Sequence, residues 1–587
     1  MSSHENMPTR TMTRVVLLRR ALVIVPVAYV FAFFVAPVVV EFLSSVRFPD
    51  FTLGEYAKFD DGPAVRRAML NSLAIAFQSS VLAALLGLVL LSGLAVWGGM
   101  VRAVVIAALL IPFAASELVR IVSWVLVLGP NGPVSRALET VFDSAPTLIG
   151  NRAGVLIGLV HVELPFFVLS ALPTVLAVRP EYVRAAASMG ANRCQRLLSV
   201  TLPLCLPGIL AAWALAFILG LAYYATPTLL GGTNEQTTLP SLIMSSMFTT
   251  ADWNQAAAQG MLLLGLAVVG CFVVARLGGL KVLYAGASSG ASGRPAPRRR
   301  RFAALSSVVY STSFQRLSSV FDWVPVRVAL VGLRGLLTAG ILLFLITPAL
   351  AAVPASLGSS TLIQLVPDEL SLRWYAELFR DPAWAAALVT SATVSIAAAL
   401  LATAIGLCAA IVLVKGWVRH QAAYFTLLLL PMIMPLPVIA LGLFLVMEHV
   451  GLAFTWGSLL IGYTLFALPY AVIVLTTGLQ SFDWTLDTAA QSLGARPLER
   501  LRDIWVPMLR PTFIVSVLFC FIIAFTELVF ALFMRTTDLT TLPVKMWTGL
   551  RYNLDPTAAA VSGLTFMLTI VVLVVGYAWR SVSGRTR

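Results

Sequence analysis

Twelve long apolar segments dominate this sequence, and they limit what the chain can fold into. Each segment has about 18 residues or more, the length that a helix needs to cross the hydrocarbon core of a bilayer. A transmembrane β-strand needs only about 9 to 11 alternating residues. Only 11% of the 587 residues are Asp, Glu, Lys or Arg, whereas soluble domains carry about 25%. The sequence therefore predicts an all-α integral membrane protein.

Six of the segments lie in each half of the chain. The predicted transmembrane helices of the first half cover residues 21–43, 69–96, 101–128, 153–176, 205–230 and 257–280. Those of the second half cover residues 328–353, 385–414, 422–447, 456–479, 512–534 and 558–579. The prediction treats each segment as one helix.

The distribution of Lys and Arg predicts how these helices are oriented. If the N-terminus is cytoplasmic, an even number of spans returns the C-terminus to the same side. The cytoplasmic segments and adjoining span ends then carry 28 of the 40 Lys and Arg residues, and the other face carries 11. This asymmetry satisfies the positive-inside rule, and the opposite orientation inverts it. Most of the net charge of +14 therefore reports topology and not a nucleic-acid partner.

A polar segment separates the two halves. Residues 285–326 are rich in Gly, Ser, Pro and Arg, a composition typical of a linker with little capacity to pack. The chain is accordingly divided into a cytoplasmic tail (1–20), a first repeat (21–284), a cytoplasmic linker (285–326), a second repeat (327–580) and a second cytoplasmic tail (581–587).

The two halves match each other at fixed offsets. Ser72 pairs with Ser391 at an offset of 319 residues, and Gly190 pairs with Gly494 at an offset of 304. The change falls between the third and fourth spans, where the first half has an extra segment at about 129–151. Both halves have six spans and begin on the same side, so the repeats are parallel. Two like bundles around a central path are typical of transporters.

The cytoplasmic loop after the fourth span follows the same pattern in both halves, at about 180–203 and 483–507. Each loop has an Ala pair, then a Gly, then a Pro before the next span. An Ala-rich turn ended by Gly predicts a short helix outside the membrane, and Pro suits the start of the following helix. The residues are Ala185, Ala186, Gly190 and Pro203 in the first loop and Ala489, Ala490, Gly494 and Pro507 in the second.

These loops resemble the EAA loop, E-A-A-x3-G-x9-I-x-L-P, of permease subunits of ATP-binding-cassette (ABC) importers. The resemblance implies the type I ABC importer permease fold, with a coupling helix in each loop that docks into a groove of an ATPase subunit. The leading Glu is replaced by Arg184 in the first copy and by Thr488 in the second, which leaves open which residue makes the polar docking contact. The residues assigned to ATPase coupling are Arg184, Ala185, Ala186, Gly190, Asp487, Thr488, Ala489, Ala490 and Gly494.

The same resemblance implies the partners. The sequence contains no G-x-x-x-x-G-K-[ST] phosphate loop, so the chain is expected not to be an enzyme, and ATP and Mg would bind to two copies of a separate ATPase subunit. An extracytoplasmic solute-binding protein would deliver the solute. The chain itself is expected to bind no cofactor and no metal ion. The expected location is the bacterial cytoplasmic (inner) membrane, with both termini in the cytoplasm.

Several segments resemble the permease pair of the polyamine (spermidine/putrescine) importers, over nearly the whole chain outside the linker. The resemblance suggests a small cationic solute as the cargo. The segments are Ser116-Glu117-Leu118-Val119-Arg120 with Trp124, Leu128-Gly129-Pro130-Asn131-Gly132, Thr226-Pro227-Thr228-Leu229-Leu230-Gly231-Gly232 and Trp374-Tyr375-Ala376-Glu377-Leu378-Phe379.

Ionisable residues inside spans give a second indication of the cargo. Such residues are costly in a membrane and mark pathways or internal ion pairs. Carboxylates and aromatic rings suit an ammonium group through ion pairing and cation–π contact. Glu117 and Arg120 could equally neutralise each other at i, i+3, and His161 is interpreted as a hydrogen-bonded helix contact. The candidate pathway residues are Glu117, Arg120, Trp124, Glu163, Tyr223, Tyr224 and Glu527.

Two alternatives remain open at this point. Fused twelve-span permeases also resemble those of ferric iron, thiamine and aminoethylphosphonate importers, although the acids in the spans disfavour an anionic cargo. A proton- or sodium-coupled secondary transporter would use the buried acids as coupling sites, but it leaves the paired EAA loops unexplained.

Overall fold

The computed structural model describes residues 9–114, 116–142, 147–231, 236–277, 324–361, 363–365, 367–552, 556–567 and 570–571. Within these residues the fold is helical, with one isolated β-bridge between Gly358 and Leu370. The predicted linker lies almost entirely outside them.

The first half contains the following elements: α1 (Thr9–Val30), η1 (Phe31–Val35), α2 (Ala36–Ser45), α3 (Gly54–Asp61), α4 (Pro63–Leu94), α5 (Gly99–Ala114), α6 (Glu117–Leu128), α7 (Pro133–Phe142), α8 (Arg152–Leu176), α9 (Pro180–Ser188), α10 (Arg193–Arg196), η2 (Leu197–Thr201), α11 (Leu202–Ala222), α12 (Ala225–Gly231), α13 (Leu239–Phe248) and α14 (Trp253–Leu277).

The second half contains α18 (Val324–Ala355), α19 (Arg373–Arg380), α20 (Pro382–Val414), α21 (Gln421–Ile433), α22 (Leu436–His449), α23 (Trp456–Gln480), α24 (Trp484–Ser492), α25 (Pro497–Arg500), η5 (Leu501–Trp505), α26 (Val506–Phe525), α27 (Val529–Met534) and α28 (Leu542–Tyr552). A further apolar helix covers Thr557–Met567.

Among the described residues, ten helices are long and apolar enough to cross a membrane, and the bent pair α21 and α22 would make eleven. The predicted all-α membrane fold is confirmed in this coarser form. The predicted twelfth span, 558–579, lies partly outside the described residues, and its described part is a shorter apolar helix.

The predicted third spans, 101–128 and 422–447, are wrong as single helices. In the first half, Pro112 cannot donate to the preceding turn, and the Ser116 hydroxyl accepts a hydrogen bond from the Val119 N–H at 3.3 Å, which starts α6 as a new helix. In the second half, α21 and α22 meet at 96° after Pro431.

The predicted fifth spans, 205–230 and 512–534, are broken in the same way. The first divides into α11 and α12, and the second divides into α26 and α27. Each half therefore has two interrupted spans at equivalent places. Interrupted helices in transporters often line a solute path, because the freed backbone groups need polar surroundings.

Side-chain packing confirms that the two halves are structural repeats. The Ser72 hydroxyl accepts a hydrogen bond from the Leu239 N–H at 2.8 Å, and Ser391 accepts one from Leu542 at 2.6 Å. Ser72 and Ser391 are 319 residues apart, and Leu239 and Leu542 are 303 residues apart. Two different pairs of residues therefore hold equivalent helices in the same way.

The first long helix of each half packs against the other half. The α1 and α2 helices contact α20 and α22, whereas α18 contacts α5 and α6. Two hydrogen bonds join these helices to the opposite half. Tyr29 Oη donates to the Ile461 carbonyl at 2.8 Å, and Ser123 Oγ donates to the Pro348 carbonyl at 2.8 Å. The two repeats are therefore interlocked.

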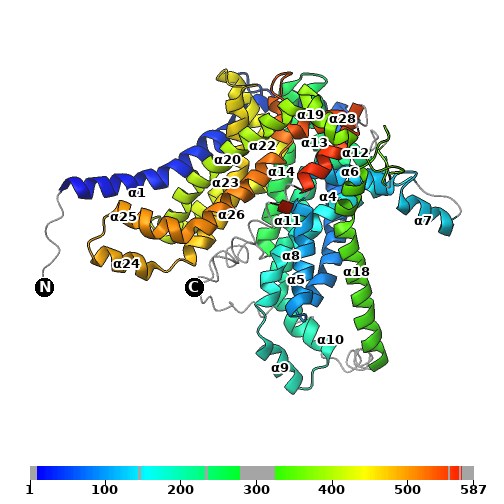
Figure 1. The fold of residues 1–587 in the computed structure, drawn as a ribbon, viewed down its shortest axis with the longest axis horizontal. Coiled ribbons are helices and arrows are strands. Elements are labelled where there is room, and N and C mark those ends of the chain that lie inside the picture. Colours follow the sequence, from blue (N-terminus) through cyan, green and yellow to red (C-terminus); the bar gives the residue numbers. More distant parts are fainter. Residues whose placement is uncertain are drawn as a thin grey trace.

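Figure 1 shows the resulting arrangement as two arms. They meet at the end that carries α12, α13 and α28, and they spread apart toward α9 and α24. One buried apolar cluster contains residues of both halves, including Trp124, Leu441 and Phe530. The cluster holds the arms together where they meet.

Candidate functional site

A cavity of about 200 Å³ lies where the broken helices of the two halves meet. Its wall includes five of the seven predicted pathway residues, namely Glu117, Arg120, Tyr223, Tyr224 and Glu527. We call it the central cavity. The first four of these residues come from the first repeat and the last from the second, so neither repeat forms the cavity alone.

Glu117 and Arg120 stand on the first turn of α6, directly after the break that follows α5. Glu117 Oε1 accepts a hydrogen bond from the Thr226 hydroxyl at 3.4 Å, and the Arg120 guanidinium donates to the Pro112 carbonyl at 2.8 Å. Both side chains are half-buried. The break in the third span thus brings a carboxylate and a guanidinium to the cavity wall.

Glu527 occupies the break between α26 and α27. Its carboxylate accepts hydrogen bonds from the backbone N–H groups of Val529 at 2.7 Å and Phe530 at 3.0 Å. The side chain therefore caps α27 while lining the central cavity. At the repeat offset of 304 residues, Glu527 is the counterpart of Tyr223.

Tyr224 separates the central cavity from a second, larger hollow. Its ring packs against Trp547 with 5.1 Å between the centroids, and it lines both spaces. The second hollow has a volume of about 830 Å³. Helices that line it, including α12, α13 and α28, lie at the end of the molecule opposite α9 and α24. Because its wall includes Arg67, Arg535 and Arg551, we call it the arginine vestibule.

The structure places the other two predicted pathway residues away from the central cavity wall. Glu163 is fully buried and accepts a hydrogen bond from Ser79 Oγ at 2.8 Å. Trp124 packs against His161 and Phe344, with centroid distances of 5.7 and 5.2 Å. The interpretation of His161 as a helix contact is confirmed, since its Nε2 lies 3.1 Å from the Leu345 carbonyl.

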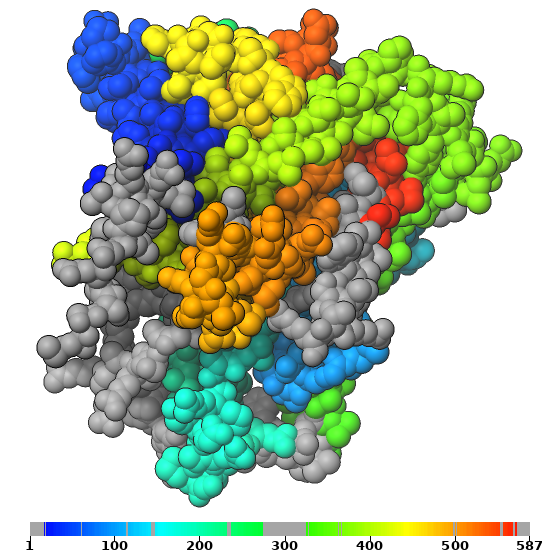
Figure 2. Space-filling model, turned by 60° about the vertical axis from the view of Figure 1, so that its left-hand side comes forward, coloured from blue at the N-terminus to red at the C-terminus, as the bar shows by residue number. Residues whose placement is uncertain are grey.

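The loops at the other end of the molecule form short helices, and Figure 2 shows both on the surface, with α24 in orange and α9 in turquoise. The α9 helix contains Arg184, Ala185 and Ala186, and α24 contains Asp487, Thr488, Ala489 and Ala490. Gly190 and Gly494 follow them with φ of +83° and +84°. This left-handed conformation favours glycine and turns the chain at the same point in both loops.

Two apolar positions on each loop are exposed, and the sequence analysis did not select them. Tyr182 and Met189 are 51% and 79% exposed, and their counterparts Leu486 and Leu493 are 42% and 88% exposed. Exposed apolar side chains at equivalent places mark a surface suited to a protein partner. Comparison of the two loops would have found them, because both positions are apolar in each copy.

The loop of the second half is held more firmly than that of the first. Asp487 is buried and accepts hydrogen bonds from Arg500 at 3.1 Å and from Trp505 Nε1 at 2.9 Å. The Lys415 ammonium lies 3.4 Å from the centroid of the Trp484 ring, and burial lowers the pKa of Lys415. Arg184 of the first loop, by contrast, forms an exposed ion pair with Glu181 at 3.1 Å.

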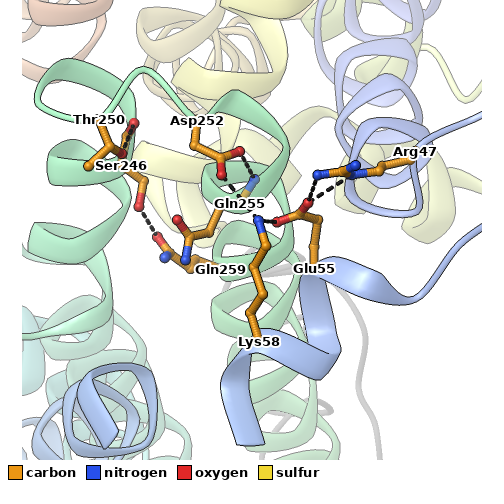
Figure 3. A network of polar contacts seen from close by, with 8 residues as sticks. All are labelled: Arg47, Glu55, Lys58, Ser246, Thr250, Asp252, Gln255 and Gln259. Carbon is orange, nitrogen blue, oxygen red and sulfur yellow. Dashed lines mark hydrogen bonds and ion pairs between the residues drawn. The ribbon is translucent and has the colours of Figure 1, made fainter. Parts of the chain in front are cut away.

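A polar network fixes the opposite end of the first half (Figure 3). Glu55 is fully buried and accepts hydrogen bonds from Arg47 Nε and Lys58 Nζ, both at 2.8 Å. Lys58 also pairs with Asp252 at 3.3 Å, and Asp252 accepts a hydrogen bond from the Gln255 N–H at 3.0 Å. The network ties the segment after α2 to the start of α14.

Comparison with known proteins identifies the family. Residues 98–279 and 402–582 match the family described as "Binding-protein-dependent transport system inner membrane component". The chain belongs to this family. It is a multi-pass inner membrane permease component with two such domains, it is not itself the ATPase, and it binds no cofactor. Membership implies ATPase and binding-protein partners.

Individual relatives match either less than half of the chain or nearly all of it. The putrescine transport system permease protein PotI of Escherichia coli (strain K12) is 32% identical over 243 residues, which are 40% of this chain and 85% of PotI. The spermidine/putrescine transport system permease protein PotC of Haemophilus influenzae is 28% identical over 35% of this chain and 79% of PotC. The "Probable ABC transporter permease protein y4fN" of Sinorhizobium fredii is 26% identical over 93% of this chain and 94% of its own length. A solved bacterial ABC transporter for alginate aligns with 46% of this chain and 98% of its own chain, at 18% identity and a TM-score of 0.33.

Proposed function

We propose that this permease conducts a small amine of the polyamine type through the central cavity, from an extracytoplasmic binding protein to the cytoplasm. The observation that carries the proposal is the shared wall of that cavity, which combines two carboxylates, Glu117 and Glu527, and one guanidinium, Arg120, with the rings of Tyr223 and Tyr224. Carboxylates and aromatic faces both attract ammonium groups. The relatives PotI, a putrescine permease, and PotC, a spermidine/putrescine permease, support the same cargo.

The size of the cavity supports a small solute. Its volume of about 200 Å³ is below the roughly 300–1,000 Å³ of pockets that hold drug-sized ligands. Much of the wall is apolar, with side chains such as Phe166, Met434 and Phe466, which suits the methylene groups of an alkyl amine.

In this proposal, the coupling loops transmit the motion of the ATPase subunits to the transmembrane helices. We assign α9 and α24 to grooves in two copies of an ATPase subunit, with both termini and both loops in the cytoplasm. The exposed pairs Tyr182 with Met189 and Leu486 with Leu493 would enter the apolar part of each groove. With this orientation the arms in Figure 1 spread toward the cytoplasm, which supports an inward-facing conformation.

Alternating access follows from this arrangement. Closure of the ATPase dimer draws α9 and α24 together, which closes the arms on the cytoplasmic side. The interlocked helices then pass the motion to the other end, where the contact between Tyr224 and Trp547 separates and admits the solute. ATP hydrolysis and release of the ATPase dimer return the arms to the inward-facing state.

The test is ATP-driven uptake of putrescine by the complete importer in proteoliposomes. Glu117→Gln should reduce the uptake rate about tenfold or more, since it removes a charge from the cavity wall. The control is Glu448→Gln, which changes an exposed acid at the end of α22 and should leave uptake unchanged. Equal uptake by the wild type and Glu117→Gln would contradict the proposed path.

A further inference from the structure

The first helix of the second half, α18, carries an arginine inside its membrane span. The span covers Val328–Ala355, so Arg334 stands six residues, or about 9 Å, from the start of the span. Among the described residues no carboxylate pairs with Arg334, and its buried Nε has no hydrogen-bond acceptor. A guanidinium at this depth is unfavourable unless it reaches a counter-charge.

The face of α18 around Arg334 is open to lipid. Leu330, Val331 and Leu337 stand four and three residues before Arg334 and three residues after it, and they are 43%, 53% and 42% exposed. Residues at these spacings share one side of a helix. An apolar face of a span that no described helix covers contacts lipid chains. Arg334 therefore lies at the edge of a lipid-facing surface.

A tryptophan and a second arginine stand beside Arg334. The Arg334 guanidinium lies 5.4 Å from the centroid of the Trp97 ring, in the turn between α4 and α5. Arg102, in the first turn of α5, donates to the Leu94 carbonyl at 3.0 Å, but its buried Nε also has no acceptor among the described residues. A Cβ on Gly98 would meet nothing within 4 Å, so there is room for a ligand next to the ring.

The equivalent contact of the other half shows what Arg334 lacks. Trp417 follows α20 by three residues, as Trp97 follows α4. The Arg19 guanidinium of α1 lies 5.5 Å from the centroid of the Trp417 ring, and its Nη2 donates to the Trp417 carbonyl at 3.1 Å. Arg334 has the same aromatic partner but no such acceptor among the described residues. Its N–H groups are therefore left for a group from outside the chain.

Nearby acids do not supply the missing charge. Between α14 and α18 the sequence has one acid, Asp322. Ten residues of helix, about 15 Å, separate Arg334 from the start of α18. In the coupling loops at this end of the molecule (Figure 1), the described acids are engaged by neighbours within their own loops, and these acids are Glu181, Asp483, Asp487, Glu499 and Asp503.

We propose that Trp97, Arg102 and Arg334 bind the phosphate group of an anionic phospholipid. Guanidinium groups donate strong hydrogen bonds to phosphate oxygens, and a Trp ring is favourable at the boundary between membrane and water. The acyl chains would lie along the exposed face of α18. With both termini in the cytoplasm, as proposed above, this lipid belongs to the inner leaflet. Because α18 and the turn after α4 come from different halves, the bound lipid would stabilise the contact between the repeats.

The test is thermal unfolding of the full-length chain, delipidated in a neutral detergent, with added phosphatidylglycerol or phosphatidylcholine of the same acyl chains. Phosphatidylglycerol should raise the midpoint further, because a ligand of the folded chain stabilises it. In the double variant Arg102→Gln with Arg334→Gln, the phosphatidylglycerol concentration that gives half of the effect should rise about tenfold or more, since charged hydrogen bonds are lost. An equal effect of the two lipids on the wild type, or an unchanged concentration in the double variant, would overturn the proposal.

Arg19→Gln is the matched control. It removes the same kind of contact with a Trp ring, but the Arg19 guanidinium already has an acceptor within the chain. The variant should therefore keep the full phosphatidylglycerol effect, and loss of that effect in Arg19→Gln but not in the double variant would place the lipid elsewhere and overturn the proposal.

Two further measurements complete the test. Soluble glycerol 3-phosphate should stabilise the wild type much less than phosphatidylglycerol; equal stabilisation would show a site for a soluble anion and overturn the proposal. Native mass spectrometry of the single variant Arg334→Gln decides the matter if the double variant does not fold. The wild type should retain one more phosphatidylglycerol molecule than this variant, and equal retention would contradict the assignment.

Discussion

Glu117 and Glu527 line one cavity, although they belong to different repeats. Each carboxylate stands where a span is interrupted, Glu117 at the start of α6 and Glu527 immediately before α27. The interruptions leave backbone N–H groups at new helix starts, and a carboxylate is favourable there. The same breaks that shorten the spans therefore create the polar part of the central cavity.

The two loop glycines predict a loss of coupling when they are replaced. Gly190→Val and Gly494→Val force a β-branched residue into a left-handed conformation that costs about 1–2 kcal/mol. We expect normal insertion but little solute-stimulated ATP hydrolysis by the reconstituted importer. Gly265→Val is the control, since a side chain there meets nothing within 4 Å. Full ATPase stimulation in both loop variants would refute the docking assignment.

The ionic and aromatic contacts of the second loop hold α24 in place, so substitutions that remove them should weaken coupling to the ATPase. Lys415→Met removes the cation over Trp484, and Asp487→Asn weakens the bonds from Arg500 and Trp505. Both changes should increase the number of ATP molecules hydrolysed per solute imported, because α24 is then held less firmly. Arg502→Gln serves as the control, since it only breaks an exposed pair with Asp503. An unchanged ratio in both variants would show that these contacts do not contribute to coupling.

Both repeats contain the same Gly–Thr packing contact, but the helix that carries the Gly in one repeat carries the Thr in the other. A second substitution is therefore expected to restore the stability lost through the first. A Cβ on Gly208 would meet Thr174, and a Cβ on Gly478 would meet Thr512; at an offset of 304 residues, each Gly in one half matches the Thr of the other. Gly208→Thr alone should destabilise the protein by about 1–3 kcal/mol through overpacking. Adding Thr174→Gly should restore most of the thermal stability. A double variant no more stable than the single one would contradict this packing.

The polar network of Figure 3 should contribute a constant amount to stability near neutral pH. The hydrogen bond to Glu55 is the largest influence on Lys58 and raises its pKa. Burial opposes ionisation of Asp252, but the Gln255 N–H and Lys58 outweigh it and lower the pKa of Asp252. The contribution of Asp252 is therefore complete above its ordinary pKa of about 3.9 and lost below it, and that of Lys58 is lost only above about pH 10.

Thermal unfolding in detergent checks this window. The difference in midpoint between the wild type and Asp252→Asn should stay constant from about pH 5 to pH 8 and shrink below about pH 4. A difference that already changes between pH 6 and pH 8 would show that another group controls the network.

The sequence predicted the parts of this molecule that depend on local pattern. Long apolar runs indicate helices, and the matched Ser72 and Ser391 indicate repeats, because these signals are contained in neighbouring or equivalent residues. The loop glycines were found for the same reason, since a helix end with positive φ selects Gly. The cost of charges inside spans pointed to Glu117 and Glu527 as pathway residues. It did not show that both carboxylates lie in one cavity with Tyr223.

The remaining features depend on contacts that the sequence does not encode locally. The exchange of α1 and α18 between the repeats arises from long-range packing. Trp124 was predicted in the path, but its neighbours His161 and Phe344 lie on other helices. The arginines of the vestibule, Arg67, Arg535 and Arg551, lie outside the predicted spans, so the cost of a charge inside the membrane did not point to them.

Thiol labelling tests whether the central cavity opens alternately to the two sides of the membrane. Tyr223→Cys would be placed in a chain whose five natural cysteines are replaced, and a membrane-impermeant thiol reagent would be added from the extracytoplasmic side of the assembled importer. We expect little labelling at rest and rapid labelling when ATP and vanadate hold the ATPase dimer closed. Equal labelling in the two states would contradict alternating access through this cavity.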